Sequence, residues 1–365
     1  WRLQAKCLRP LPEASWGDPE GRARRRSDDL VVHPAAAEVL RTRTAIVRAV
    51  RRLLDERGFL EVETPVLHAV HGGATARPFV THVNAYDLDV SLRIAPELYL
   101  KRLVVGGMGP LYEISRNFRN EGVDATHNPE FTSLEAYQPY ADYTAMRLLT
   151  EDLVRAAAVA ASGRPTLTLR SGEQIDLSGP FAVVSVTDAV SAAVGRPVSL
   201  SDPLDDLVRL ALDHGIEVGD GLGAGGVLEE LYGELVEPRT TAPTFYTDFP
   251  LETSPLTRPH RTAPGHVERW DLVVDGMELG TAYTELTDPL DQRRRLTEQS
   301  LRAAEGDPEA MEVDEDFLAA LELGMPPTGG LGIGLDRLVM LLTGQPIRGV
   351  LAFPFVRPGG SRELA

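Results

Sequence analysis

One stretch of the chain alternates charged and aromatic residues, and it constrains the fold more than any other feature. Residues 118–121 read Phe-Arg-Asn-Glu, and after a loop the alternating positions are Phe131, Ser133, Glu135 and Tyr137. Successive side chains of a strand point to opposite faces, so we expect Arg119 and Glu121 to share one face of a strand. The second set then shares one face of the next strand, which predicts an antiparallel hairpin with a charged surface.

Charged groups in the middle of strands are unfavourable unless they meet a ligand or each other. Arg119 has the geometry to clamp a phosphate or a carboxylate, and Phe131 offers a surface on which a base can stack. The alternative is a surface hairpin with cross-strand ion pairs. Because the pattern continues as far as Tyr137, it favours a ligand site.

A second segment brings carboxylates together. Asp271 and Glu278 flank an Asp-Gly turn at 275–276, and Glu285 follows on the same stretch. Two carboxylates that converge across a hairpin suit a magnesium ion carrying the phosphates of a nucleotide. A solvated acidic hairpin is the alternative, and spacing alone does not exclude it.

A third segment is a glycine-rich strand at 329–334 that leads into an amphipathic helix beginning near Asp336. Glycines allow a ligand to approach the backbone closely, and Arg337 in the first helical turn is placed to reach a phosphate or a base. A tight packing joint between strand and helix would explain the glycines but not the arginine. A dinucleotide fingerprint fits poorly, because no βαβ unit surrounds the glycines.

The rest of the pattern indicates an α+β fold, with mostly antiparallel strands and a few helices. Helices are predicted at 34–58, 97–105, 141–161 and 288–304, and strands at 59–65, 79–95, 110–117, 128–139, 244–250, 268–274 and 277–286, before a strand–helix pair at 328–343. Residues 164–242 contain several prolines and a glycine patch at 219–226, which predicts an insertion with short helices.

Composition excludes several classes of protein. With 37 Lys+Arg against 54 Asp+Glu the net charge is −17, so nucleic acid cannot bind through bulk charge and needs a local basic patch. The run Arg22-Ala-Arg-Arg-Arg26 is the candidate patch, with a solvated face as the alternative. The lone Cys7 excludes an intramolecular disulfide and a cysteine zinc cluster, and fits a reducing cytosol. No apolar run approaches the roughly 18 residues that span a bilayer.

Together these segments resemble the catalytic domain of class II aminoacyl-tRNA synthetases, specifically lysyl-tRNA synthetase. Residues 59–65 are similar to the first motif of that family, which builds its dimer interface, and 113–137 and 329–341 are similar to the second and third motifs. The stretches 71–79 and 92–102 resemble the lysine-type signature. The match extends from about residue 1 to 358 and is least distinctive over 164–242.

The resemblance implies a class II catalytic domain with a six- to seven-stranded antiparallel sheet, flanked by helices, in a homodimer. Residues 34–365 would form this domain, with a small helical insertion at about 164–242. Residues 1–33 would be a linker that follows the family's anticodon-binding OB domain, which we do not find in the sequence; the opening residues resemble the last strand of something upstream.

The resemblance also implies roles for residues at the nucleotide. Arg119 and Arg337 would be catalytic: Arg119 would hold the α-phosphate and the lysine carboxylate, and Arg337 would cover adenine and touch the γ-phosphate. Phe131 would stack on the other face of adenine. The further ATP contacts would be Glu121, His127, Asn128 and Glu278, and the ligands of Mg²⁺ would be Asp271 and Glu278.

Lysine would be held by a second set of residues. Gly73 and Glu97 would line its α-amino end, and Arg119 and Thr281 its carboxylate end. Selection of the ε-ammonium would fall to Glu135, Tyr137, Tyr283 and Glu285. Such a pocket makes physical sense, because a buried ammonium needs carboxylate partners to offset its desolvation.

The implied reaction is lysine activation: the lysine carboxylate attacks the α-phosphate of ATP, and the lysyl group then passes to tRNA(Lys). Two departures matter, because housekeeping enzymes usually carry glutamate at Asp271 and asparagine at Thr281. With residues 247–260, these departures are most similar to the synthetase portion of bifunctional lysylphosphatidylglycerol synthetases, which carry a membrane transferase upstream. The expected location is the cytoplasm, or the membrane if such a transferase is fused to the chain.

Two other functions stay open at this point. One is a stand-alone ligase that lysylates a non-tRNA acceptor, as the elongation factor P lysine ligase does. The other is a non-catalytic paralogue that binds lysine. Arg119, Glu278 and Arg337 are all present, and this argues against the paralogue.

Overall fold

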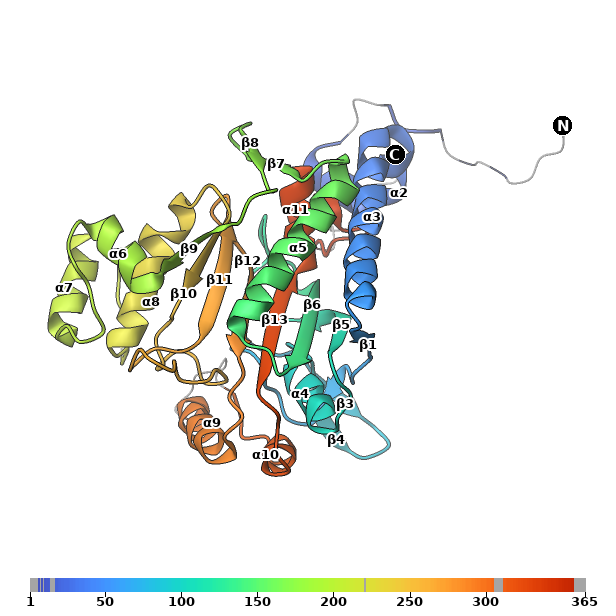
Figure 1. Cartoon of the computed structure of the whole chain (residues 1–365). Coiled ribbons are helices and arrows are strands. Elements are labelled where there is room, and N and C mark those ends of the chain that lie inside the picture. Colours follow the sequence, from blue (N-terminus) through green and yellow to red (C-terminus); the bar gives the residue numbers. More distant parts are fainter. Residues whose placement is uncertain are drawn as a thin grey trace.

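The computed structural model describes residues 6, 8, 10–13, 17–219, 221–304 and 311–357. Cys7 and most of the strand expected at the beginning of the chain lie outside these residues. The described chain forms a central twisted sheet with helices packed along it and a helical lobe at one end (Figure 1).

The central sheet has eight strands in the order β1-β5-β6-β13-β12-β11-β10-β9. Its six inner strands are antiparallel neighbours, which agrees with the expected α+β fold and antiparallel sheet. Each of the two edge strands is parallel to its neighbour, β1 to β5 and β9 to β10. They bring the sheet to eight strands, where six to seven were expected. The bounds are β1 Leu60–Glu61, β5 Leu111–Phe118, β6 Glu130–Pro139, β9 Ala182–Ser185, β10 Thr244–Thr247, β11 Arg269–Val274, β12 Met277–Thr284 and β13 Thr328–Gly334.

Three helices cover one face of this sheet: α3 (Pro34–Glu56), α5 (Tyr143–Ser162) and α11 (Leu335–Thr343). Alternate residues of the strands, such as Leu134 of β6 and Leu331 of β13, join these helices in one buried apolar cluster. The other face of the sheet carries α4 (Glu97–Val105) against β5 and β6. One face is therefore core, and the other remains available for a ligand.

The predicted insertion is only partly helical. Residues 166–185 form the hairpin β7 (Thr166–Thr168) and β8 (Gln174–Asp176) and then the edge strand β9. The helices α6 (Val186–Val194), α7 (Leu204–Asp213) and α8 (Ala224–Leu235), with the short helix η1 (Glu237–Arg239), follow. They pack on β10 and β11 through Tyr246 and Val273, so the lobe closes that end of the sheet.

Part of the expected linker is helical as well, in α1 (Pro19–Arg24) and α2 (Arg26–Val32). Its arginines are occupied within the chain: Arg24 pairs with Glu20, Arg22 and Arg26 share the fully buried Asp29, and Arg25 pairs with Asp28. The structure therefore favours a structural role for the arginines at 22–26, in ion pairs that stabilise local helices, over a patch that binds nucleic acid.

The other elements frame the ligand-facing side. A small sheet is formed by β2 (Leu67–His68), β4 (Leu88–Leu92) and β3 (Val80–Val83). The remaining helices are α9 (Pro289–Ala304), α10 (Glu315–Glu322) and α12 (Ile347–Val350). Among the described helices, none has the length and apolar character needed to cross a bilayer.

Candidate functional site

A cavity of about 280 Å³ lies on the face of the sheet opposite α5 and α11. Its walls come from β6, β12 and β13, the loop between β5 and β6, α4 and the start of α11. The predicted site residues in its lining are Glu97, Arg119, Glu121, His127, Asn128, Phe131, Glu135, Tyr137, Glu278, Thr281, Tyr283, Glu285 and Arg337. Gly73 and Asp271 are not part of the lining.

The glycines of β13 form the floor of this cavity. Gly330 lies between Tyr137 of β6 and Tyr283 of β12, and Gly332 lies between Glu135 and Thr281. These glycines face the ligand side, while Leu331 and Ile333 between them face the buried core. At these two positions the central strand therefore adds no side chain to the floor, and the side chains of its two neighbours lie around it.

Arg119 stands at one end of the cavity with its guanidinium carbon 5.1 Å from the centre of the Phe131 ring. Among the described residues, its buried Nε has no hydrogen-bond partner. β5 ends at Phe118, so the prediction that Arg119 and Glu121 lie within a strand is wrong. Both belong to the loop that follows β5, which still turns them into the cavity.

A second arginine approaches the same end from α11. Arg337 Nη1 donates a hydrogen bond to the Glu278 carbonyl oxygen (2.8 Å) and lies 3.5 Å from Glu278 Oε2. Its Nη2 lies 3.4 Å from His127 Nε2. Backbone N–H donors, led by that of Thr126, lower the pKa of Asp124, which in turn contacts the His127 ring (2.8 Å).

Two polar side chains near this end, Asn128 and Asp336, bind other groups of the protein. Asn128 donates to the Glu130 carbonyl oxygen (2.6 Å) and accepts from the Phe355 backbone N–H (3.2 Å). Asp336 accepts from the Thr132 backbone N–H (2.8 Å) and pairs with Arg43 of α3 (2.5 Å). These contacts fix the strand that carries Phe131 against the helix that carries Arg337.

The other end of the cavity is acidic. Tyr137 donates to Glu135 Oε2 (3.2 Å), and burial, reinforced by the negative charge of Glu97, raises the pKa of Glu135 to about 8. Burial also raises the pKa of Glu285, against the pull of the Lys101 ammonium. This end is therefore short of positive charge. Gly73, with φ of +88°, lies behind Glu97, and a β-carbon on it would lie 3.1 Å from the Glu97 β-carbon.

Lys101 pairs with two carboxylates of this acidic end. Lys101 Nζ lies 2.6 Å from Glu97 Oε1 and 2.5 Å from Glu285 Oε2, and its side chain is fully buried. Burial opposes its charged form, but the two carboxylates outweigh that effect and raise the pKa of Lys101. Glu97 and Glu285 thus share one internal ammonium.

The two predicted magnesium ligands lie on neighbouring strands, but they are not equally available. Asp271 is buried and accepts from Arg269 Nε (3.1 Å) and Nη2 (2.8 Å), whereas the Glu278 side chain is 40% exposed. Glu237 Oε1 accepts from the Glu278 backbone N–H (3.2 Å), and burial and the Glu278 charge raise the pKa of Glu237. In the described part of the chain, no three or more His, Cys, Asp or Glu residues form a set able to enclose a metal.

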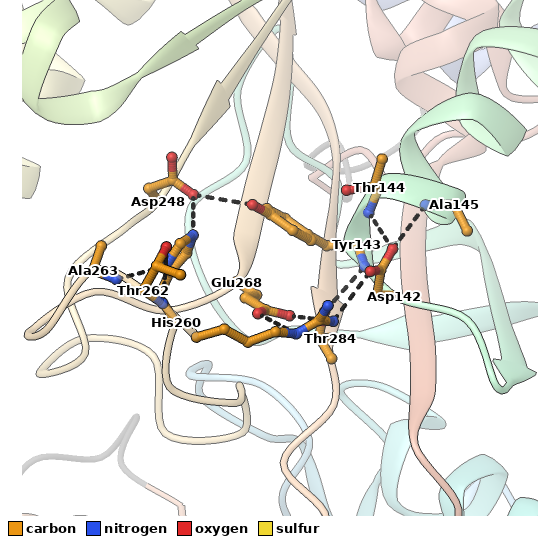
Figure 2. Close-up of polar contacts among 11 residues, drawn as sticks. Asp142, Tyr143, Thr144, Ala145, Asp248, His260, Thr262, Ala263, Glu268 and Thr284 are labelled. Carbon is orange, nitrogen blue, oxygen red and sulfur yellow. Dashed lines mark hydrogen bonds and ion pairs between the residues drawn. The ribbon is translucent and has the colours of Figure 1, made fainter.

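Behind the acidic end, a polar network fixes the strand that leads into Glu285 (Figure 2). The Tyr143 backbone N–H donates to Thr284 Oγ1 (3.1 Å), and the Thr284 N–H donates to the Glu268 carbonyl oxygen (2.9 Å). Arg261 bridges Glu268 (2.8 Å) and Asp142 (3.1 Å). This network joins the start of α5 to the end of β12 on the core side, so Glu285 projects from a fixed backbone.

Three residues with clear contacts at the site were missed from sequence: Lys101, Arg269 and Glu237. For Lys101 there was a signal, because Lys6 and Lys101 are the two lysines among 37 Lys+Arg residues. For Arg269 and Glu237 there was none, because their partners are defined by strand pairing and by the packing of the helical lobe.

Known proteins resemble the chain over most of its length. Residues 18–357 match the family described as tRNA synthetases class II (D, K and N). A "Lysylphosphatidylglycerol biosynthesis bifunctional protein LysX" is 56% identical over 364 residues in Gordonia bronchialis, 56% over 365 in Nocardia farcinica and 57% over 365 in Mycobacterium avium. These alignments cover 98% of this chain and 32%, 32% and 31% of the relatives, so the chain spans about a third of their length. With its antiparallel sheet and the pocket on one face, the chain belongs to the class II tRNA synthetases of the D, K and N group.

Proposed function

We propose that this chain activates L-lysine with ATP to form lysyl-adenylate and passes the lysyl group to tRNA(Lys). The observation that carries the proposal is one cavity with two unlike ends. At one end an arginine, whose Nε has no hydrogen-bond partner among the described residues, stands beside an aromatic ring, and buried carboxylates gather at the other end. A diamino acid with a reactive carboxylate matches both ends.

The acidic end suits the ε-ammonium of lysine. Glu135 and Glu285 are carboxylates whose ionised forms are disfavoured by burial, and a substrate ammonium would relieve that penalty. Specificity would rest on charge and reach, since arginine is too large for the site and ornithine too short.

The arginine end suits the α-phosphate of ATP and the lysine carboxylate. Arg119 would clamp both, because its guanidinium presents parallel donors to paired oxygens. Phe131 and Arg337 would enclose adenine from its two faces. The reaction needs no general base: the carboxylate oxygen attacks the α-phosphorus, and the bond to pyrophosphate breaks.

Magnesium fits this site as an ion shared with the nucleotide, because such ions commonly take one or two protein carboxylates together with phosphate oxygens. Glu278 and Asp271 would hold it, and when bound it would neutralise charge on the triphosphate. Arg269 would orient the Asp271 carboxylate and oppose the effect of burial, which raises the pKa of Asp271.

The acceptor of the lysyl group is proposed from the names of the relatives. The names of the relatives refer to lysylphosphatidylglycerol biosynthesis, so we propose that lysyl-tRNA made here serves lipid lysylation, or translation, in a membrane-linked protein of that kind. The net charge of −17 argues that tRNA meets a restricted surface instead of the whole face of the molecule.

The test is lysine-dependent exchange of pyrophosphate into ATP, with ornithine and arginine as control substrates. We expect exchange with lysine, and a loss of about 10²- to 10³-fold in Arg119→Ala, because that variant removes a charge-stabilising donor. Arg155→Met is the matched control, since Arg155 pairs with Glu151 and Asp152 on the core-side helix α5.

Unchanged exchange in Arg119→Ala would overturn the assignment of the active site. Exchange without subsequent charging of tRNA would move the proposal to a non-tRNA acceptor. Absence of exchange with every amino acid would reject lysine activation, and the non-catalytic lysine-binding function would then lead.

A further inference from the structure

Two carboxylates of the proposed lysine pocket already pair with an ammonium group that belongs to the protein. Lys101 comes from α4, one helical turn after Glu97, and its buried Nζ pairs with Glu97 and with Glu285 of the segment after β12, two carboxylates that line the cavity. The ion pairs therefore connect two carboxylates to which the family resemblance gives different partners, the α-amino group of lysine for Glu97 and the ε-ammonium for Glu285.

The choice of lysine at this position is specific. The chain uses arginine for nearly all of its cations, with Lys6 and Lys101 as its two lysines. The large buried ion pairs elsewhere use arginine, as Arg93 does with Glu113 (2.7 Å). A planar guanidinium needs a wider space than a compact ammonium, which can lie between two converging carboxylate oxygens.

The number of charges in the pocket indicates a role for the Lys101 ammonium. Glu97, Glu135 and Glu285 are three carboxylates, and Lys101 neutralises one charge among them. The surplus equals the two ammonium groups of a lysine substrate, whose own carboxylate would lie at Arg119. Without Lys101 the same pocket would carry one unmatched negative charge even when it is full.

We propose that Lys101 is a positioning and specificity-determining residue: it holds Glu97 and Glu285 in place and sets the pocket charge to match a diamino acid. The inference rests on the proposed function, because it takes lysine as the substrate. Lys101 acts through these two carboxylates and does not itself contact the reacting atoms.

The arrangement also couples lysine binding to proton release. The charged or titratable groups that face Glu135 and Glu285 are Glu97 and Lys101 of α4, Glu113 of β5, Arg119, Tyr137 of β6 and Tyr283 of β12. Burial and the charge of Glu97 raise the pKa of Glu135 to about 8, and its carboxyl group must be ionised to pair with the substrate. Lysine affinity should therefore increase as the pH rises from about 7 to about 9.

The first experiment compares Lys101→Met with the wild type by exchange kinetics and by calorimetry. Methionine keeps the length of the side chain and removes the charge. We expect the KM for lysine to increase about 100-fold, because removal of the ammonium leaves buried carboxylate charge without a partner. The KM for ATP should change less than about twofold. The pH at which lysine affinity is half-maximal should also move upward, since Glu97 and Glu285 lose their cation.

Calorimetry in buffers of different ionisation enthalpy counts the protons released when lysine binds, and it requires no turnover. Lys101→Arg supplies a folded variant that keeps the charge if the methionine variant does not fold. Its larger head group should displace the carboxylates and increase the KM for lysine by about tenfold. Arg155→Met, which removes a cation from the core-side helix, should leave the KM for lysine and the proton count as in the wild type.

Chemical rescue separates a charge role from simple packing. Lys101→Ala should regain lysine-dependent exchange when ethylammonium is added but not when ethanol is added, and the wild type should gain nothing from either. Equal losses for lysine and ATP in Lys101→Met, without a shift in pH profile or rescue by the amine, would overturn the inference. Failure of the wild type to bind or activate lysine would instead reject the proposed function.

Discussion

At the scale of single residues, the pocket depends as much on missing side chains as on those present. Gly330 lies on the floor between Tyr137 and Tyr283, and a β-carbon placed there would lie 2.0 Å from Glu285 Oε1 and 2.6 Å from Tyr137 Cε1. Neither neighbour is free to retreat, because Glu285 is held by Lys101 and both side chains are buried. The glycine is thus required by the carboxylate beside it.

We therefore expect Gly330→Ala to damage lysine recognition selectively. The added methyl group would push the Glu285 carboxylate away from its position, and overpacking of this kind corresponds to an increase of about 10- to 100-fold in the KM for lysine. The KM for ATP should change little, since the adenine end lies several residues away along β13. Steady-state pyrophosphate exchange measures both.

Gly233→Ala is the matched control for this substitution. Gly233 lies inside α8, and a β-carbon there meets no atom within 4 Å. The control should keep both KM values and gain slightly in stability from the better helix propensity of alanine. If Gly330→Ala also keeps the wild-type KM for lysine, the Glu285 carboxylate is not a determinant of the pocket.

At the scale of elements, one aspartate begins a helix and anchors a loop. Asp142 is the N-cap of α5, where its Oδ1 accepts from the backbone N–H groups of Thr144 (3.0 Å) and Ala145 (3.2 Å), as Figure 2 shows. Its other oxygen accepts from Arg261 (3.1 Å), which also pairs with the buried Glu268. The cap and the ion pair make separable contributions.

We expect Asp142→Ala to lower the free energy of unfolding by about 1–2 kcal/mol, because both the cap and the ion pair are lost. Asp142→Asn keeps the capping oxygen and should lose less than about 1 kcal/mol, since a half-exposed ion pair contributes little. Urea unfolding followed by circular dichroism measures the difference. Equal losses in the two variants would show that the charge, and not the cap, stabilises this junction.

The same scale shows what the sequence could predict. Local periodicity located α4 at 97–105 and the β13–α11 pair correctly, because a helix or strand with one buried face repeats its apolar residues at a fixed interval. The strand predicted at 59–65 is limited to Leu60–Glu61 in the structure, because its pairing with β5 extends only over these residues. In the predicted insertion, β9 joined the main sheet, a long-range pairing that no local pattern reveals.

The candidate site followed the same division. The types of residue at 119, 131, 135, 278 and 337 were visible in sequence, and the structure gathers these positions around one cavity. Their charge states were not visible, because the pairing of Lys101 with Glu285 and of Arg269 with Asp271 depends on tertiary contacts. Glu237 comes from the helical lobe, where sequence analysis predicted no part of the site.

At the scale of the whole molecule, several large apolar side chains remain exposed on the side of the chain formed by β1 to β4. Large apolar residues that remain exposed on β1 to β4 and the segments between them are Leu60, Val66, Leu67, Val80, Tyr86 and Leu88. The edge strand β1 belongs to this group and lies in the segment that resembles the dimer-forming motif of the family. We propose that two copies of the chain associate through this side.

A charged residue at this edge should separate the copies. We expect the wild type to be a dimer at micromolar concentration and Leu60→Glu to be a monomer, because a carboxylate buried at an apolar interface has no partner. Leu212→Glu, which charges an exposed apolar residue of α7 in the helical lobe, should remain a dimer.

Sedimentation velocity measures the three masses, and circular dichroism establishes that each variant is folded. A monomeric wild type, or a Leu60→Glu dimer as stable as that of Leu212→Glu, would place the interface elsewhere or reject it. In the expected case, pyrophosphate exchange should fall with dissociation, since α3 and β1 at this edge also support the strand that leads to Arg119.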